Sequence, residues 1–222
     1  MRRCLVLAVA LLAVSCGGTP AGPGPDAAGL VSGAISAMRE VASAHFEMTR
    51  EGAPLTVEGL VFDSAVGRYA APAAAEAVLR LRAGDLAVEL GTVSVGERTW
   101  LTNPITGRYE ELRPGSGFNP AVLFDPVAGW VALLRDLSGV ALVEAGGPTH
   151  HLRGTVPPAR VEALTASLAA GQSVPMDLWL DAGTLRIVRL EFSTVGDAGR
   201  SDWVITMSDF GAPVQIDPPV EG

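Results

Sequence analysis

The stretch AVLRLRAGDLAVEL, residues 77–90, shows the pattern that decides the fold of this chain. In its first half leucines alternate with arginines, and in its second half Leu86, Val88 and Leu90 alternate with alanine and glutamate. Because successive side chains of a β-strand point to opposite faces of the sheet, each half predicts a strand with one apolar face. The Ala83-Gly84-Asp85 segment between the halves is typical of a short turn. The stretch therefore predicts two antiparallel strands that share a buried face.

The same period of two recurs on both sides of this stretch. Apolar and polar side chains alternate at 46–48, 55–59, 93–100, 176–180, 188–192 and 203–207. Glycine and proline separate these runs, as at Gly67, Pro72 and Asn103-Pro104. Short strands that follow one another at intervals of about 8–12 residues are typical of an antiparallel meander.

Helical periodicity is found before the strands and in the middle of the chain. Apolar side chains three or four residues apart predict a helix over 30–44, a short helix that begins at Pro126, and a helix over 158–170. Asn119-Pro120 is a typical helix start, because asparagine caps the first amides and proline fits the first turn. We therefore expect an α+β fold, in which a strongly curved antiparallel sheet (a half-barrel) has helices capping its concave face.

The N-terminus has the features of a signal peptide. Two arginines precede an apolar run of eleven residues, 4–14, which is too short to span a bilayer. Residues 12–16, Leu-Ala-Val-Ser-Cys, resemble a bacterial lipobox, in which the cysteine is linked to diacylglycerol and becomes the new N-terminus. The match departs from the usual form, since Ala13 occupies the position where leucine is most common. An ordinary signal cleavage with Cys16 incidental is the alternative.

These features divide the chain into three parts. We expect 1–15 to be a signal peptide, 16–29 a lipidated N-terminus with a Gly/Pro-rich tether, and 30–222 a single domain. After cleavage Cys16 is the only remaining cysteine, so no disulfide forms within the mature chain. Several acyl chains on one residue supply the two signals that stable membrane attachment needs.

The composition excludes several functions. All 16 basic residues are arginines, so a Schiff base, a pyridoxal site and a phosphate-binding loop with its lysine are excluded. A formal charge of −8 argues against nucleic acid as a partner. Aromatic residues make up only 5% of the chain while 48% of it is hydrophobic, so the apolar surplus is aliphatic.

No catalytic or metal-binding pattern stands out. Two of the three histidines, His150 and His151, are adjacent, which does not suit one metal ion, and we interpret them as a solvated loop pair. The motif of a serine-hydrolase elbow does not occur. Asp125, next to Pro126, is better explained as a helix cap than as an acid catalyst. We expect no enzymatic activity, no metal and no cofactor.

Four ordered blocks carry a resemblance to a known family. The run Asn119-Pro120-x-x-Leu123-Phe124-Asp125-Pro126-x-x-Gly129, followed by Leu133-Leu134, is similar to a block in the LppX/LprG (LppX_LprAFG) group of exported lipoproteins. Residues 43–46 (SAHF), 178–181 (LWLD) and 205–214 (ITMSDFGAPV) resemble further blocks in the same order. With the lipobox-like start, the resemblance covers residues 28–218 and contains no catalytic signature.

The resemblance implies a LolA-like half-barrel whose cavity holds the acyl chains of a lipid, in a family linked to carrying triacylated glycolipids or triacylglycerol across the cell envelope. The implied partners are a lipid or glycolipid, the outer face of the cell membrane through the anchor, and a membrane lipid transporter, with the protein a monomer. The candidate cavity residues are Phe46, Met48, Val57, Leu79, Leu81, Leu86, Val88, Leu90, Leu123, Phe124, Leu133, Leu134, Leu178, Leu180, Ile205 and Met207. The alternative is that these side chains fill an ordinary core and that the protein is an envelope scaffold or signalling lipoprotein.

The anchor hypothesis predicts the effect of replacing Cys16 with serine. Without a thiol there is no acyl attachment, and the acidic chain has no basic patch to hold it at a lipid surface. The Cys16→Ser protein should therefore leave the membrane fraction and appear in the soluble fraction of a fractionated cell. If it stays with the membrane, Cys16 is not the anchor.

Overall fold

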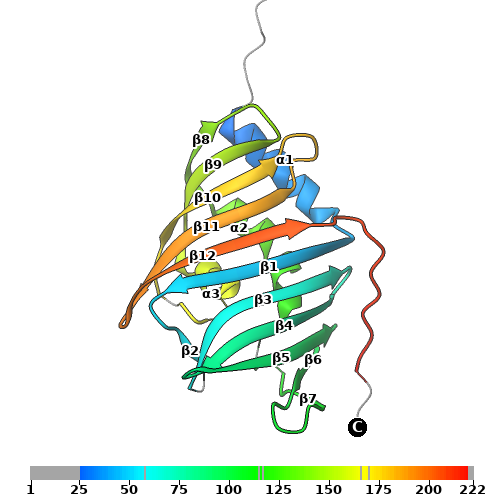
Figure 1. Ribbon diagram of the computed structural model, residues 1–222. Helices are drawn as coiled ribbons and strands as arrows, with labels where there is room; N and C mark the ends of the chain where they lie inside the picture. Colours follow the sequence, from blue (N-terminus) through cyan, green and yellow to red (C-terminus); the bar gives the residue numbers. More distant parts are fainter. Residues whose placement is uncertain are drawn as a thin grey trace, which may run out of the picture.

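An antiparallel sheet forms the body of the protein (Figure 1). The computed structural model describes residues 26–219, apart from 58, 115, 117, 166 and 170. In this part of the chain the sheet has twelve strands, in the order β7-β6-β5-β4-β3-β1-β12-β11-β10-β9-β8, and β2 pairs with β3 beside this path. Their bounds are β1 (Ser43–Gly52), β2 (Thr56–Val57), β3 (Leu60–Ala70), β4 (Ala74–Ala83), β5 (Leu86–Val95), β6 (Arg98–Thr102), β7 (Tyr109–Glu111), β8 (Ser138–Glu144), β9 (Thr149–Val156), β10 (Val174–Asp181), β11 (Ile187–Gly196) and β12 (Gly199–Ser208).

The first long strand and the last strand meet in the middle of the sheet. β1 pairs with β3 on one side and with β12 on the other, so that Phe46 lies opposite Met207 and Met48 opposite Ile205. Strands β3–β7 therefore lie on one side of β1, and strands β8–β12 lie on the other. The pairing of β1 with β12 joins these two halves of the sheet.

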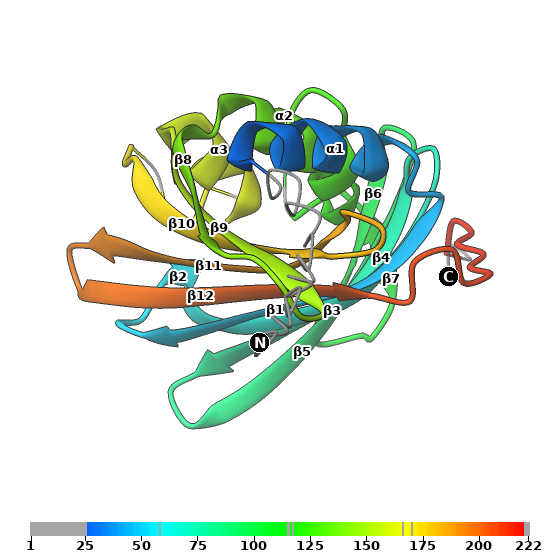
Figure 2. The same ribbon diagram turned by 90° about the horizontal axis from the view of Figure 1, so that it is seen from above.

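Four short helices cover one face of the sheet. They are α1 (Ala27–Arg39), the 3-10 helix η1 (Pro120–Phe124), α2 (Trp130–Asp136) and α3 (Pro158–Leu164). Figure 2 shows the sheet bending upward around this helical layer, so the helices lie against its concave face. The predicted fold class, a curved antiparallel sheet with helices over its concave face, is confirmed. Within the described residues no helix has the length and apolarity needed to cross a membrane.

Alternation along the strands separates an aliphatic interior from a charged exterior. In β4 the side chains of Leu79 and Leu81 are buried under the helices, whereas Arg80 and Arg82 lie on the outer face and pair with carboxylates of neighbouring strands. The turn before β5 is tight, and Gly84 has a φ of 61°, which favours glycine. The hairpin predicted from 77–90 is therefore confirmed.

A small second core lies on the outer face. Val93 and Trp100, paired across β5 and β6, are buried beneath Ile216 of the C-terminal segment, and Val214 packs against the same group. The guanidinium of Arg98 lies 4.5 Å from the Trp100 ring centre. The C-terminal segment thus covers apolar side chains that the helices, on the opposite face, do not reach.

The first helix lies earlier in the chain than we predicted. α1 begins at Ala27, inside the segment we expected to be tether, because the Asp26 side chain accepts a hydrogen bond of 2.7 Å from the amide of Gly29. It ends at Arg39, well before 44, because from Ser43 onward the chain pairs with β3 and β12. Sheet pairing overrides the helical period at this end.

The two middle helices are also shorter than predicted. Pro126 does not begin α2, since Oδ1 of Asp125 accepts the amides of Val127 and Ala128 and holds them in a turn. Val127, which follows Pro126 in this turn, is 74% exposed. α3 ends at Leu164 rather than 170. The Thr165 hydroxyl accepts the amide of Ala169 and closes a turn instead of another helical turn.

Gly129 allows η1 and α2 to approach each other closely. A Cβ atom at this position would collide with the carbonyl oxygen of Leu123. The Gly129 amide also donates to the Asp125 carbonyl at 2.8 Å, which fixes the start of α2 against the end of η1.

We predict that Gly129→Ala lowers the free energy of unfolding by about 2 kcal/mol, because the two helices must separate to admit the methyl group. Chemical denaturation measures the loss. Gly196→Ala is the matched control, since nothing lies within 4 Å of the added carbon there, and its effect should stay within about 0.5 kcal/mol. Equal effects of the two substitutions would contradict the close packing of η1 against α2.

Candidate functional site

The structure brings most of the predicted cavity residues together in one hydrophobic cluster between the sheet and the helices. Those that are buried in this cluster are Phe46, Met48, Leu79, Leu81, Leu90, Leu123, Leu133, Leu134, Leu178, Leu180, Ile205 and Met207. Val88 and Phe124 are partly buried and pack against the cluster. In the described residues these side chains contact one another and form a packed interior.

One predicted residue lies outside this cluster, and the side chain of another is not described. Leu86 is 67% exposed, because it is the first residue of β5, at the tip of a hairpin where the helices do not cover the sheet, and our placement of it in the interior is wrong. The backbone of Val57 pairs with Leu60 in the short β2–β3 ladder, but its side chain lies outside the described residues. Cys16 also lies outside the described residues.

Aromatic rings connect the helical layer to the sheet. The ring of Phe124, at the end of η1, stacks on Tyr69 of β3 with 3.9 Å between ring centres. Phe46 of β1 and Trp130 of α2 lie 6.4 Å and 6.3 Å from the same ring. Four aromatic side chains therefore meet at this point, where they hold η1 and α2 against the centre of the sheet.

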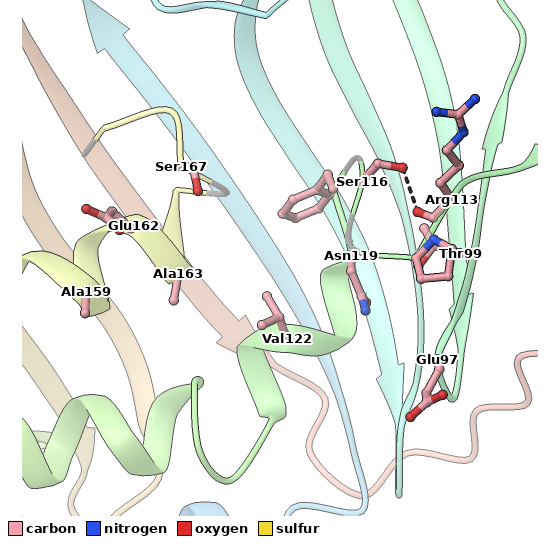
Figure 3. Close-up of a pocket in the computed structure, with 12 residues that line it drawn as sticks. Glu97, Thr99, Arg113, Ser116, Asn119, Val122, Ala159, Glu162, Ala163 and Ser167 are labelled. Atoms are coloured by element: carbon pink, nitrogen blue, oxygen red, sulfur yellow. Dashed lines mark hydrogen bonds between the residues drawn. The ribbon is translucent and has the colours of Figure 1, made fainter. Parts of the chain in front are cut away.

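A first opening lies at the surface between η1 and α3 (Figure 3). Its volume is about 460 Å³. It is lined by Glu97, Thr99, Arg113, Pro114, Ser116, Phe118, Asn119, Val122, Ala159, Glu162, Ala163 and Ser167. Because these residues come from the β5–β6 turn, the segment before η1, η1 itself and α3, the opening exists only in the folded chain.

The lining of this first opening is apolar on one part and polar on another. Val122 and Ala163 face it from η1 and α3 in Figure 3, and Phe118 adds an apolar ring. Glu97, Arg113 and Glu162 supply charges. Such a mixed surface suits a molecule with an apolar part and a neutral polar part.

A second opening, of about 540 Å³, lies between α1 and α2. It is lined by Ala28, Val31, Ser32, Ile35, Leu134, Arg135, Leu137 and Val140, so that Arg135 is its one charged lining residue. The apolar side chains predicted for the first helix divide between the buried cluster and the second opening. Ala34 and Met38 are buried in the cluster, whereas Val31 and Ile35 line the opening.

Arg160 ties the helical layer together. Its Nε donates to Asp136 Oδ2, at the end of α2, at 2.7 Å, and its Nη1 donates to the carbonyl oxygen of Val127 at 2.9 Å. Since Arg160 belongs to α3, these two bonds hold α3 against α2 and against the turn that precedes it. They border the first opening without lining it.

The histidine pair is part of the sheet and not a loop, so our interpretation of it as a solvated loop is wrong. His150 and His151 lie in β9, where pairing with β10 continues to Thr149. His151 faces outward, stacks on Trp179 at 4.4 Å and lies 2.6 Å from Asp177 through Nε2. Burial raises the pKa of Asp177, but hydrogen bonds from Arg153 and His151 and their charges outweigh burial and leave that pKa below its ordinary value.

Sequence reasoning missed the residues that form the two openings. The β8 and β9 strands escaped notice although Leu152 and Val156 alternate with polar neighbours. Val31 and Ile35 were recognised as part of an apolar stripe but not as surface. For Glu97, Arg113 and Glu162 no local pattern exists, since only the fold brings them together.

Among the described residues no cluster of three or more histidine, cysteine or carboxylate side chains could hold a metal ion.

Comparison with known proteins identifies the family. The sequence model of the LppX_LprAFG lipoproteins matches residues 26–216, nearly all of the described chain. The chain belongs to the LppX_LprAFG lipoprotein family. The match begins at Asp26, the residue that caps α1. No curated protein sequence matches the chain.

Two solved structures of LppX_LprAFG-type proteins have the same fold. LprF from Mycobacterium bovis is 20% identical, with a TM-score of 0.63 over 87% of this chain and 96% of its own. Lipoprotein LppX from Mycobacterium tuberculosis is also 20% identical, with a TM-score of 0.58 over 85% of this chain and 98% of its own. At this identity the likeness establishes the fold.

We predict that Arg160→Gln loosens the helical layer. Loss of two charge-assisted hydrogen bonds should lower the free energy of unfolding by about 1 kcal/mol, and amide exchange in α2 should accelerate. Hydrogen exchange followed by mass spectrometry measures the second effect. Arg80→Gln, which removes an exposed ion pair with Glu89 on the outer face, is the control and should leave exchange in α2 unchanged. Unchanged exchange in both variants would show that Arg160 does not restrain α2.

Proposed function

We propose that this lipoprotein binds the acyl chains of lipids or glycolipids between its sheet and its helical layer and carries them across the cell envelope. The observation that carries the proposal is the continuous aliphatic cluster, with an opening on each side of the η1–α2 segment. Membership of a lipoprotein family supports it.

The energetics of acyl-chain transfer favour an interior of this kind. Burial of a methylene group from water contributes about 0.8 kcal/mol, so a 16-carbon chain gains roughly 13 kcal/mol. In a bilayer the chain is already out of water, and its transfer into an apolar protein interior leaves the free energy nearly unchanged. A carrier therefore needs an extended aliphatic surface of modest affinity and no tight polar site.

The dimensions and chemistry of the openings support the proposal. Volumes of about 460 Å³ and 540 Å³ fall within the roughly 300–1,000 Å³ that small-molecule sites occupy. The first opening is lined by two carboxylates, one guanidinium, the amide of Asn119 and three hydroxyl groups. Hydroxyl groups of a glycerol or sugar match such a mixed surface better than an anionic headgroup does.

An anchor on Cys16 would keep the protein where its ligand is. Ten peptide units separate Cys16 from Asp26, so the folded domain would begin at most about 36 Å from the lipidated residue. We further propose that the anchored monomer receives lipid from the outer face of the cell membrane and exchanges it with a membrane lipid transporter.

One observation favours a second candidate function. The side chains we predicted to line a cavity pack against one another, with nearly all of them buried in one cluster. A filled core of this kind is what an envelope scaffold or signalling lipoprotein needs. Lipid uptake distinguishes the two functions, because a carrier must part this cluster and a scaffold need not.

The decisive experiment is native mass spectrometry of the full-length chain carrying Cys16→Ser, which has no anchor lipid to confuse with ligand. A carrier should retain lipid through purification, or take up a fluorescent fatty acid supplied to it. Recovery of no lipid together with no uptake of the probe would reject the carrier function and favour the scaffold.

We also predict that Ala163→Trp, which fills the first opening with an indole, slows the uptake of the fluorescent fatty acid about tenfold without unfolding the protein. Ala163 is only partly buried, so the larger side chain has room on the surface side. Ala87→Trp, at an exposed outward-facing position of β5, is the matched control and should leave uptake unchanged. Equal rates in the two variants would exclude the first opening as an entrance.

A further inference from the structure

Trp130 carries a buried N–H group that the protein does not use. Its side chain is 1% exposed, and its Nε1 has no hydrogen-bond partner among the described residues. A buried indole N–H normally finds an acceptor, because leaving it without one costs about 1–3 kcal/mol. An unpaired donor at this depth therefore requires an explanation.

The other interior tryptophan shows how the fold satisfies such a group. Trp203 of β12 is equally buried, and its Nε1 donates to the hydroxyl of Thr194 on the neighbouring strand at 2.9 Å. Trp100 has an unpaired Nε1 as well, but it lies in the small core on the outer face beneath the C-terminal segment. Of these three, Trp130 alone combines an unpaired donor with a place in the interior beneath the helices.

Trp130 lies where η1, which lines the first opening, meets α2, which lines the second. It is the first residue of α2, and Gly129 before it packs closely against the carbonyl of Leu123. Leu134, one helical turn later on the same face of α2, lines the second opening. Val122, in the η1 helix against which α2 starts, lines the first. Trp130 therefore adjoins segments that line both openings.

The chemistry of the indole limits what its partner can be. The indole of tryptophan can only donate a hydrogen bond, so the missing partner of Trp130 must be an acceptor. The buried Nδ1 of His150 also has no partner among the described residues, but it donates or accepts according to its tautomer and so does not define the chemistry of a ligand. Hydrocarbon chains offer no acceptor. The carbonyl oxygen of a carboxylic ester is the acceptor that enters an apolar interior together with acyl chains.

We propose that Trp130 determines specificity for acyl esters by donating the hydrogen bond of its Nε1 to an ester carbonyl of the bound lipid. This inference rests on the proposed acyl-chain binding. An ester-linked lipid gains the bond and relieves the unpaired donor. An ether-linked lipid of the same length has a methylene in place of each carbonyl, and it offers the donor only the weaker acceptor of an ether oxygen.

The test is a competition between 1,2-dipalmitoylglycerol and 1,2-dihexadecylglycerol, which differ only in those carbonyls. The two lipids are offered in equal amounts to the full-length chain carrying Cys16→Ser, and native mass spectrometry gives the ratio of the two complexes. The diester complex should exceed the diether complex about tenfold. In Trp130→Phe the ratio should fall to about one, because the diester loses its advantage.

Trp203→Phe is the matched control, since it also removes a buried indole N–H but one already paired within the protein. It should keep the preference for the diester. Equal binding of the two lipids by the protein with Trp130 intact, or an unchanged preference in Trp130→Phe, would overturn the role of Trp130 and leave acyl-chain binding standing. If neither lipid binds, the proposed function itself fails.

A spectroscopic readout covers the case in which Trp130→Phe does not fold. The chain has four tryptophans, so four indole N–H resonances are expected in a protein labelled with ¹⁵N. The Trp130 resonance, assigned by through-space contacts to the Phe124 ring, should move downfield when the diester is added and stay in place with the diether. Movement with both lipids or with neither would reject the hydrogen bond.

Discussion

The need to cover one apolar face of a large curved sheet governs the rest of this structure. Strands throughout the chain place aliphatic side chains on the concave face, and burial of that surface is the main favourable term in folding. Four short helices supply the cover, and they are joined to the sheet and to each other by few specific contacts. Because the cover consists of small separate pieces, openings remain between them.

The contacts within the helical layer differ in kind from those that hold the sheet. Each strand is joined to its neighbours by backbone hydrogen bonds, and arginine–carboxylate pairs cross the outer face. The helices depend instead on the Phe124 ring cluster, on the close approach at Gly129 and on Arg160. Under the proposed function, this layer, attached at a few points, is the part that would open to admit a ligand while the sheet remains intact.

The sequence allowed the strands to be predicted wherever one face is apolar and the other polar, as in Leu79 to Arg82. It failed at element ends, where a single side chain decides. Asp26 starts α1 early and Asp125 delays α2, and neither effect is visible in an apolar period. Most of the residues predicted for the interior are buried there, whereas Leu86 is exposed, since a period of two shows which face is apolar but not how far along a hairpin the cover extends.

The openings could not be foreseen in the same way. Glu97 and Glu162 are far apart in the chain, and nothing local marks them as neighbours. Trp130 is buried as a packing residue. Its N–H is unpaired because the fold places no acceptor of the described residues within reach of Nε1, and no local sequence pattern indicates this.

The pairing of β1 with β12 also sets the order in which the protein can fold. Beside this pair the Ser43 hydroxyl donates to the carbonyl of Ala212, 169 residues along the chain. Contacts of such long range close only after a large loss of chain entropy, and they slow folding. One edge of β1 pairs with the nearby β3, but its other edge pairs with β12, so the sheet is completed only when nearly the whole chain is present. Until β12 is made, that edge of β1 remains without its final partner.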